Sequence, residues 1–314
     1  MRDRYTRVID GEGVEVDPYF LPDDGRRYLV HVSGGRTSGF MLRRILDAHG
    51  GSLPEYARAV FANTGKERPE TLRFIGAMEA AWGVPITCLE YTYRPFARGG
   101  LRDPKNTWRE VSPASASLDG RPFEEMIRSR AMLPNVVMRM CTEELKVNTA
   151  NRWARDALRW GWRVRWSVLG IRHDEPRRWR KALFDECRTV YPLVHGEVSE
   201  GDVLGFWGRQ SFDLGLRPDQ GNCDLCFLKG QAKLRQLISE EPERADWWIR
   251  QEARREMEGI NGRPATRDPT IQQFLKRRSF TQLRQEALSM PMLPLRAVDD
   301  EGEAPAGVSC FCGD

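Results

Sequence analysis

The stretch that decides the fold is residues 28–46, which read YLVHVSGGRTSGFMLRRIL. An apolar run over residues 28–32 leads directly into two glycines, and apolar residues then recur over 40–46. A short apolar run that ends in glycine is typical of a buried strand, and the residues after it continue as a helix. The stretch therefore predicts a strand, a tight glycine loop and a helix in immediate succession.

The same order of strand and helix repeats along the chain until about residue 195. Further strands are expected at 57–62, 85–91 and 164–169, and further helices at 67–82 and 143–160. Such alternation predicts an α/β fold, a parallel sheet with helices on both faces. Ligands of these sheets bind beyond the carboxyl ends of the strands. Three loops follow predicted strands and should line one crevice: 33–38, 63–67 and 170–175.

The remainder of the chain divides around this α/β domain, which we place at residues 27–195. Residues 1–26 are polar and predict an N-terminal arm, and residues 94–120, rich in Pro, Gly and Ser, predict an irregular insertion. Residues 196–314 predict a mainly helical, cysteine-bearing region. Its helices are expected near 201–210, 227–239, 243–258 and 270–288.

Composition limits the class of protein. The chain has 314 residues, of which 40% are hydrophobic and 30% are charged. That apolar content is sufficient for a core and far too low for a membrane protein. No window of about 18 apolar residues is present, and the N-terminus has no apolar segment of a signal peptide. We therefore expect a cytoplasmic protein with no membrane partner.

Basic residues are concentrated in one part of the chain. The net charge is only +4, yet residues 152–188 contain eleven Lys or Arg against five Asp or Glu. Five tryptophans are interleaved with them: Trp153, Trp160, Trp162, Trp166 and Trp179. Basic residues with interleaved aromatics can bind the phosphates and bases of a nucleic acid. A solvated arginine-rich helix with its tryptophans in the core explains the same pattern.

The glycine loop Ser33–Ser38 has the composition of an anion site. Two glycines permit positive φ angles, so that several backbone N–H groups can converge on one point at the start of a helix. Ser33, Thr37 and Ser38 add hydroxyl groups. The sequence is neither a Walker loop nor a dinucleotide fingerprint. A glycine turn with a serine cap is the alternative explanation.

Four segments together resemble a known family. SGGRTS at 33–38 resembles the PP-loop of the N-type ATP pyrophosphatases. Three further segments resemble motifs of the phosphoadenosine phosphosulfate (PAPS) reductase-like branch: FANTGKERPETL at 61–72, RMCTEELK at 139–146 and GIRHDE at 170–175. The resemblance implies the adenine nucleotide alpha hydrolase-like fold for residues 27–195, with ATP as ligand.

The matched positions imply roles for individual residues. The nucleotide-binding set is Ser33, Gly34, Gly35, Arg36, Thr37, Ser38, Asn63, Lys66 and Glu67. The catalytic set is Arg36, Lys146, Arg172, Asp174 and the tail residue Cys312. The PP-loop usually has Lys-Asp where this chain has Arg36 and Thr37. Because that Asp often helps to bind a metal ion, the resemblance leaves open whether Mg²⁺ accompanies ATP here. Sulfonucleotide reductases have S-F-G in place of S-G-G, so this loop favours cleavage of ATP at the α–β bond.

Seven cysteines in a chain without an export signal indicate metal, cluster or thiol chemistry. Cys141 lies 82 residues before Cys223, which forms a C-x-x-C with Cys226. The assimilatory adenylylsulfate reductases resemble this layout and bind a [4Fe-4S] cluster there. The resemblance implies a cluster on these three residues. Cys312, or else Cys310, would be the fourth ligand that such clusters usually have, or an exogenous substrate or sulfide would occupy an open iron. Structural zinc on the same cysteines and unlinked thiols are alternatives.

The combined expectation is an ATP-dependent, AMP-forming iron–sulfur sulfurtransferase. Its acceptor would be tRNA or DNA, and a cysteine desulfurase would supply sulfur or an electron donor would supply electrons. The first alternative is a sulfonucleotide reductase, in which Cys312 attacks PAPS or adenylylsulfate and sulfite is released. The second is a non-catalytic nucleotide-binding module with structural zinc.

Overall fold

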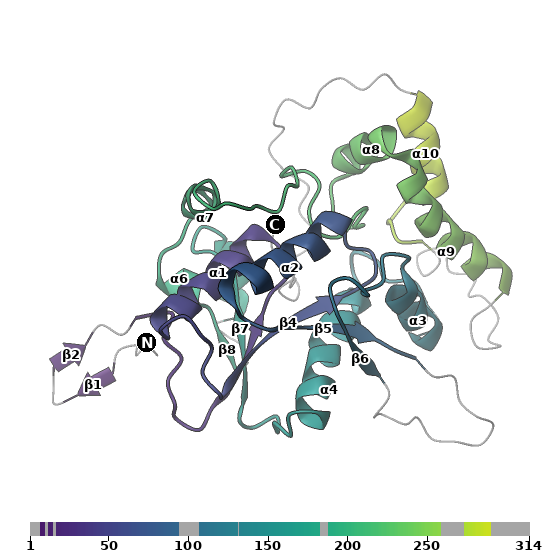
Figure 1. The fold of residues 1–314 in the computed structure, drawn as a ribbon. Coiled ribbons are helices and arrows are strands. Elements are labelled where there is room, and N and C mark those ends of the chain that lie inside the picture. Colours follow the sequence, from purple (N-terminus) through teal and green to yellow (C-terminus); the bar gives the residue numbers. More distant parts are fainter. Residues whose placement is uncertain are drawn as a thin grey trace, which may run out of the picture.

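Six strands form one sheet in the order β6-β5-β4-β3-β7-β8 (Figure 1). The structure is a computed structural model that describes residues 7–9, 12–14, 17–93, 107–130, 132–182, 188–258 and 273–289. The strands are β3 (Arg27–His31), β4 (Ala57–Asn63), β5 (Ile86–Tyr91), β6 (Trp108–Val111), β7 (Arg165–Leu169) and β8 (Thr189–Val190). The described part of the arm contains the antiparallel pair β1 (Arg7–Ile9) and β2 (Glu12–Val14).

The sheet is mostly parallel, so the chain has a mixed α/β fold. β3 lies between β4 and β7 and pairs with both in parallel, with Val30 opposite Ala59 on one side and Val168 on the other. β4 with β5 and β7 with β8 are also parallel pairs. The direction of strand addition therefore reverses at β3, which places the loops after β3 and β7 at a topological switch point.

The prediction that residues 94–120 are wholly irregular is wrong, because they contain β6. β6 is antiparallel to β5, with Cys88 opposite Val111. Its stabilisation comes from outside the segment: Arg109 Nε donates to Oε2 of Glu90 on β5 at 2.8 Å. The polar sequence of the segment carries no sign of that partner.

Helices cover both faces of the sheet (Figure 1). Side chains alternate along β3, so Tyr28, Val30 and Val32 join one apolar cluster and Leu29 joins another. The first cluster includes residues of α1 (Arg36–Ala48), α2 (Pro69–Trp82) and α7 (Glu200–Trp207). The second includes residues of α4 (Thr149–Asp156) on the opposite face.

The predicted helix 143–160 differs from the observed one at both ends. It begins as a π-helix, η2 (Cys141–Asn148), and continues as α4 only to Asp156. The hydroxyl of Thr149, the first residue of α4, donates to the carbonyl of Glu144 in η2 at 2.7 Å. Arg159 then adopts φ 60°, and the N–H of Trp160 bonds to the carbonyl of Ala154 at 3.0 Å, which ends the helix.

Several helices were absent from the sequence prediction, and others begin or end differently. The unpredicted helices are α3 (Arg121–Arg130), α5 (Pro176–Ala182) and α6 (Pro192–His195), and the helix predicted at 243–258 starts as the 3-10 turn η3 (Pro242–Arg244). Beyond α7, the described residues form α8 (Gln231–Glu240), α9 (Ala245–Glu258) and α10 (Phe280–Ser289). Trp248, Phe274 and Phe280 pack in a separate apolar cluster among α8, α9 and α10.

No helix within the described residues is both long enough and apolar enough to cross a membrane.

Candidate functional site

The glycine loop between β3 and α1 has a backbone that requires glycine at one position. Gly34 has φ +82°, and a Cβ there would lie 2.4 Å from Cγ2 of Thr71 on α2. Gly35 has φ −97° and precedes the first residue of α1. The resemblance placed the two glycines together, and the structure separates their roles: Gly34 makes the turn and Gly35 begins the helix.

Two serines hold this loop in shape. The Oγ atoms of Ser33 and Ser38 lie 2.9 Å apart, and Ser38 Oγ also accepts from the N–H of Ser33 at 2.9 Å. Ser38 Oγ donates in turn to the carbonyl of Gly35 at 3.0 Å. The first turn of α1 has no acidic residue, so the positive end of its dipole is not offset by the helix itself. The arrangement is suited to an anion.

The loop after β7 packs directly against the start of α1. A Cβ on Gly170 would lie 3.1 Å from Cα of Ser38, and Arg172 Nη1 lies 3.4 Å from Oγ1 of Thr37. Arg172 Nε donates to Asp174 at 2.9 Å, and Asp174 also accepts from the N–H of Glu200 at 2.8 Å. Partial burial opposes ionisation, but these two hydrogen bonds hold the pKa of Asp174 below its usual value.

The polar side chains of the loop after β4 form hydrogen bonds with other buried protein groups. Asn63 Nδ2 donates to Glu90 Oε1 at 2.7 Å and to the carbonyl of Ser117 at 2.8 Å. Glu67 accepts from the N–H and the hydroxyl of Thr64, at 2.9 and 2.7 Å. Burial raises the pKa of Glu67, and the nearby charge of Lys146 on η2 opposes that rise. A nucleotide contact by Asn63 stays a prediction.

The C-x-x-C loop lies across the loop after β4. The carbonyl of Asn222 accepts from the N–H of Arg68 at 2.9 Å, and the N–H of Asp224 donates to the carbonyl of Lys66 at 2.8 Å. Lys66 Nζ and Asp224 Oδ2 form a buried ion pair at 3.0 Å. Asn222 Nδ2 also donates to the carbonyl of Ser33, at 3.2 Å. The cysteine loop and the glycine loop are therefore in contact.

The cysteines themselves are brought together in part. Cys223 is hydrogen-bonded to Cys226, and this bond, burial and the nearby carboxylates raise the pKa of the Cys223 thiol. Cys141, the first residue of η2, packs against the same apolar cluster as Cys223. In the part of the chain that the structure describes, no three His, Cys, Asp or Glu side chains are grouped closely enough to hold a metal. The predicted ligand Cys312 lies outside the described residues, as does Cys310.

Arg36 does not point its guanidinium at the glycine loop. Its Nε donates to Asp213 Oδ1 at 2.7 Å, and its Nη1 donates to the carbonyl of Leu216 at 3.0 Å. The hydrogen bond from Arg36 holds the pKa of Asp213 below its usual value. Phosphate binding by Arg36 stays a prediction that requires the arginine to leave this carboxylate.

Some residues of this region carried no sequence signal that we used. Asn222 and Asp224 flank Cys223, and their position beside a C-x-x-C could have identified them. Asp213 and Glu200 lie in the segment after the α/β pattern fades, and no local motif marks them. Only the fold brings them to α1 and to the loop after β7.

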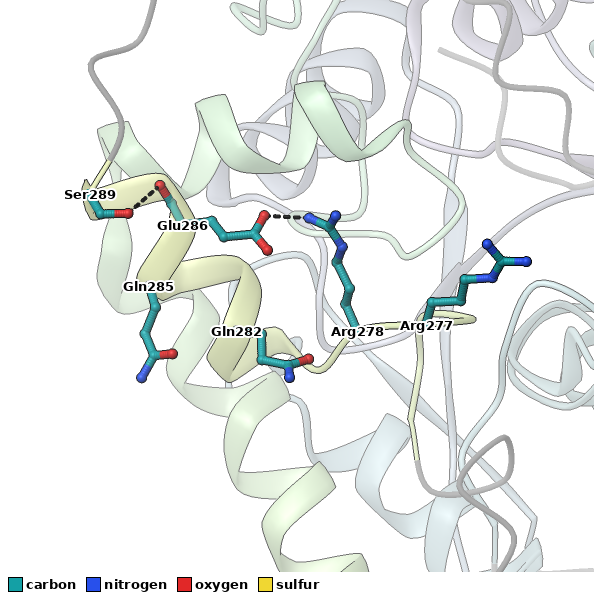
Figure 2. Close-up of a pocket in the computed structure, with 6 residues that line it drawn as sticks. All are labelled: Arg277, Arg278, Gln282, Gln285, Glu286 and Ser289. Carbon is teal, nitrogen blue, oxygen red and sulfur yellow. Dashed lines mark hydrogen bonds and ion pairs between the residues drawn. The ribbon is translucent and has the colours of Figure 1, made fainter.

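A pocket elsewhere on the molecule shares no residue with these loops. Figure 2 shows its lining on and just before α10, where Arg278 pairs with Glu286 and Ser289 Oγ donates to the carbonyl of Glu286. The other lining residues are Arg277, Gln282 and Gln285. Since none of the predicted site residues lines it, the candidate site remains the group of loops beside α1.

Comparison with known proteins gives one related sequence and no function. No family model matches the chain. The chain is 29% identical over 207 residues to the uncharacterized nin region protein ORF290 of Escherichia phage lambda. The match spans 66% of this chain and 67% of the phage protein. The name of that protein states no activity, so the likeness is between sequences alone.

Proposed function

We propose that this protein binds ATP at the glycine loop and cleaves it between the α- and β-phosphates, as PP-loop enzymes do. The observation that supports the proposal is the contact between the glycine loop and the loop after β7 at the start of α1, with Asn222 of the cysteine loop bonded to Ser33. Gly34 makes a turn that no other residue makes without a clash, and Gly170 approaches the same helix end. Arg172 adds a cation beside Thr37.

The chemistry follows from what these groups can stabilise. An oxygen of the acceptor forms a bond to the α-phosphorus, the bond to the β-phosphate oxygen breaks, and pyrophosphate leaves. Backbone N–H groups at the start of α1 and the guanidinium of Arg172 would stabilise negative charge on the phosphates, which is the main contribution of protein groups in such transfers. Asp174 holds Arg172 by its Nε.

The second half of the proposal is sulfur transfer to the adenylylated acceptor. A sulfur nucleophile forms a bond to the acceptor carbon, and AMP leaves with the oxygen. Cys223 and Cys226 are already adjacent, and Cys141 lies on η2 against the same cluster of side chains. These three residues would hold a [4Fe-4S] cluster, which would supply iron that binds sulfur. Because no three His, Cys, Asp or Glu side chains of the described residues are grouped closely enough to hold a metal, no step of the proposal depends on the cluster.

The decisive experiment is pyrophosphate release from ATP by the wild-type protein and a Gly35→Val variant. Gly35 has φ −97°, which a β-branched residue adopts without strain, so the variant should fold. Its side chain would cover the N–H groups at the start of α1, and we expect ATP binding and pyrophosphate release to be lost. Unchanged ATP affinity in a folded Gly35→Val protein would contradict the proposal.

The products separate the alternatives. Sulfite release from PAPS or adenylylsulfate, with no pyrophosphate from ATP, would identify a reductase. ATP binding without any product would identify a nucleotide-binding module. Iron and acid-labile sulfide analysis of protein purified without oxygen, together with zinc analysis, would identify the metal.

A further inference from the structure

The turn between α4 and β7 displays a tryptophan among arginines. Trp162 is 63% exposed, although most of its large side chain is normally buried in folded proteins. The guanidinium carbons of Arg188 and Arg163 lie 4.6 and 5.5 Å from the centre of its ring. Arg188 Nη1 also donates to the carbonyl of Trp162 at 2.9 Å, which fixes the turn against the residue before β8. The ring of Trp162 is therefore exposed to solvent and lies beside two guanidinium groups.

Three arginines lie in or beside this turn, and one acid is near them: the hydrogen bond from Arg155, and to a smaller extent the charge of Arg159, lower the pKa of Asp156. In the described part of the chain, no carboxylate forms an ion pair with Arg159, Arg163 or Arg188, whereas Arg155 is paired with Asp156. Arginines that are gathered at one turn without a direct ion pair raise the local positive potential, which favours a polyanion.

Arg159 has an unusual backbone conformation for its residue type. Its φ is 60°, in the left-handed region that glycine and asparagine adopt most readily. For other residues this conformation costs about 1 kcal/mol. An arginine here adds positive charge to the turn at the expense of local stability, and strained residues are often found at functional positions.

We propose that this turn is a docking surface for single-stranded nucleic acid. The phosphates would lie on Arg159, Arg163 and Arg188, and an unpaired base would stack on Trp162, a combination found in proteins that bind single strands. A membrane surface fits less well, because only Val164, at 41% exposure, adds apolar area within the turn.

The position of the turn gives the surface a role distinct from that of the ATP site. The turn precedes β7 and lies at the lower end of the sheet in Figure 1, whereas the glycine loop follows β3. The two are separated by at least the length of β3, about 16 Å for five residues. The surface would therefore hold the nucleic-acid strand at a distance from the proposed ATP site, and nucleic-acid binding does not depend on ATP.

The inference also identifies which part of the basic stretch 152–188 is the candidate nucleic-acid surface. Trp153 is 3% exposed and donates to Glu110 at 2.6 Å, and Trp166 packs under Arg26. Trp179 on α5 packs against an apolar cluster, and Arg178 is paired with Glu175. These three tryptophans are thus structural, and the turn with Trp162 is where an exposed tryptophan of the stretch lies beside arginines.

The test is fluorescence anisotropy of a labelled oligothymidylate of about 20 nucleotides, titrated with the full chain at about 50 and 200 mM salt. We expect Trp162→Ala to weaken binding about 5- to 100-fold, which corresponds to the loss of one stacked base, and Trp162→Phe to restore most of it. The triple variant Arg159→Ala/Arg163→Ala/Arg188→Ala should lower the slope of log affinity against log salt by about 2.

A matched control removes the same charge elsewhere. Arg73→Ala/Arg209→Ala/Arg277→Ala changes arginines on α2, after α7 and before α10, and should leave the slope near that of the wild type. Equal loss in both triple variants, or an unchanged affinity in Trp162→Ala, would overturn the proposal. Tighter binding to phosphatidylserine vesicles than to the oligonucleotide would also overturn it, in favour of a membrane surface. ATP binding without nucleic acid should be unchanged in all these variants.

Discussion

Gly34 and Gly25 have almost the same backbone conformation but different surroundings, which isolates the effect of packing in the glycine loop. Their φ angles are +82° and +83°. A Cβ on Gly25 would meet nothing within 4 Å, whereas a Cβ on Gly34 would lie 2.4 Å from Thr71. We expect Gly25→Ala to lower the free energy of unfolding by about 1 kcal/mol. Gly34→Ala should cost about 2 kcal/mol more because of the clash.

Urea denaturation of both variants measures this difference. Thr71→Ser removes the obstructing methyl group, so it should recover part of the loss when combined with Gly34→Ala but not when combined with Gly25→Ala. Equal destabilisation by the two glycine variants would mean that the loop does not pack on α2 as described.

His31, the last residue of β3, should make stability depend on pH. Burial, and then the charge of Arg165, lower the pKa of His31 to about 4, from a usual value near 6.5. Below pH ~6.5 the unfolded chain takes up a proton that the folded chain refuses, so stability falls as the pH falls towards 4. The expected loss is up to about 3 kcal/mol.

The measurement is the free energy of unfolding at several pH values for the wild type and His31→Leu. The variant should lose most of the slope between about pH 6.5 and 4.5. Burial also lowers the pKa of His49, so a smaller slope of the same sign should remain. A full slope in His31→Leu would assign the effect to other groups.

At the level of elements, the buried carboxylate of Glu90 joins three parts of the chain. It accepts from Asn63 on β4 at 2.7 Å and from Arg109 on β6 at 2.8 Å, and it also bonds to Ser117. Removing one partner of a buried ionic group costs about 3–5 kcal/mol. We expect Glu90→Gln to approach this range and to expose the amides of β6 to hydrogen exchange.

The control for this prediction is Glu55→Gln, the same chemical change at an exposed position before β4. It should change stability by less than about 0.5 kcal/mol. If β6 exchanges no faster in Glu90→Gln than in the control, the edge strand is held by its backbone ladder alone.

The elements that were predicted from the sequence are determined by residues within the element itself. The elements that were missed are stabilised by residues distant in sequence. β3, β4 and β5 are apolar runs ended by polar or glycine residues, so period and composition were sufficient to locate them. β6 and η2 depend on partners distant in sequence, as the bond of Arg109 to Glu90 and the ion pairs of Glu144 with Arg130 and Arg152 illustrate. A pattern within one segment cannot report such partners.

At the level of the whole molecule, the site was predictable as a set of loops but not as a set of contacts. Alternation of strands and helices predicts parallel strands, so the loops 33–38, 63–67 and 170–175 were expected together beyond the carboxyl ends of the strands. The sequence could not show that Arg36 pairs with Asp213, because 177 residues separate the two. Nor could it show that Lys66 pairs with Asp224 in the C-x-x-C loop.

The pair of Lys66 and Asp224 links the two halves of the proposed site, and it allows the role of Lys66 to be tested. Both side chains are nearly buried, at 8% and 5% exposure, and Lys66 Nζ also lies 5.1 Å from the ring centre of Trp247. Since these contacts engage the ammonium group, we expect Lys66 to join the loops rather than to bind phosphate. Asp224→Leu alone should cost about 3–5 kcal/mol, because it leaves a buried charge without a partner.

Replacing both members separates the two roles of this lysine. Lys66→Met/Asp224→Leu removes both charges of this buried pair, and such replacements are often neutral in stability. If the lysine only joins the loops, the double variant should regain the stability lost in Asp224→Leu and bind ATP within about threefold of the wild type, a difference below 1 kcal/mol. A double variant that folds stably but binds ATP tenfold or more weakly, about 1.4 kcal/mol, would place Lys66 on the nucleotide. Thermal melting and equilibrium dialysis with ATP on the same samples distinguish these results, because loss of folding and loss of a phosphate contact affect different measurements.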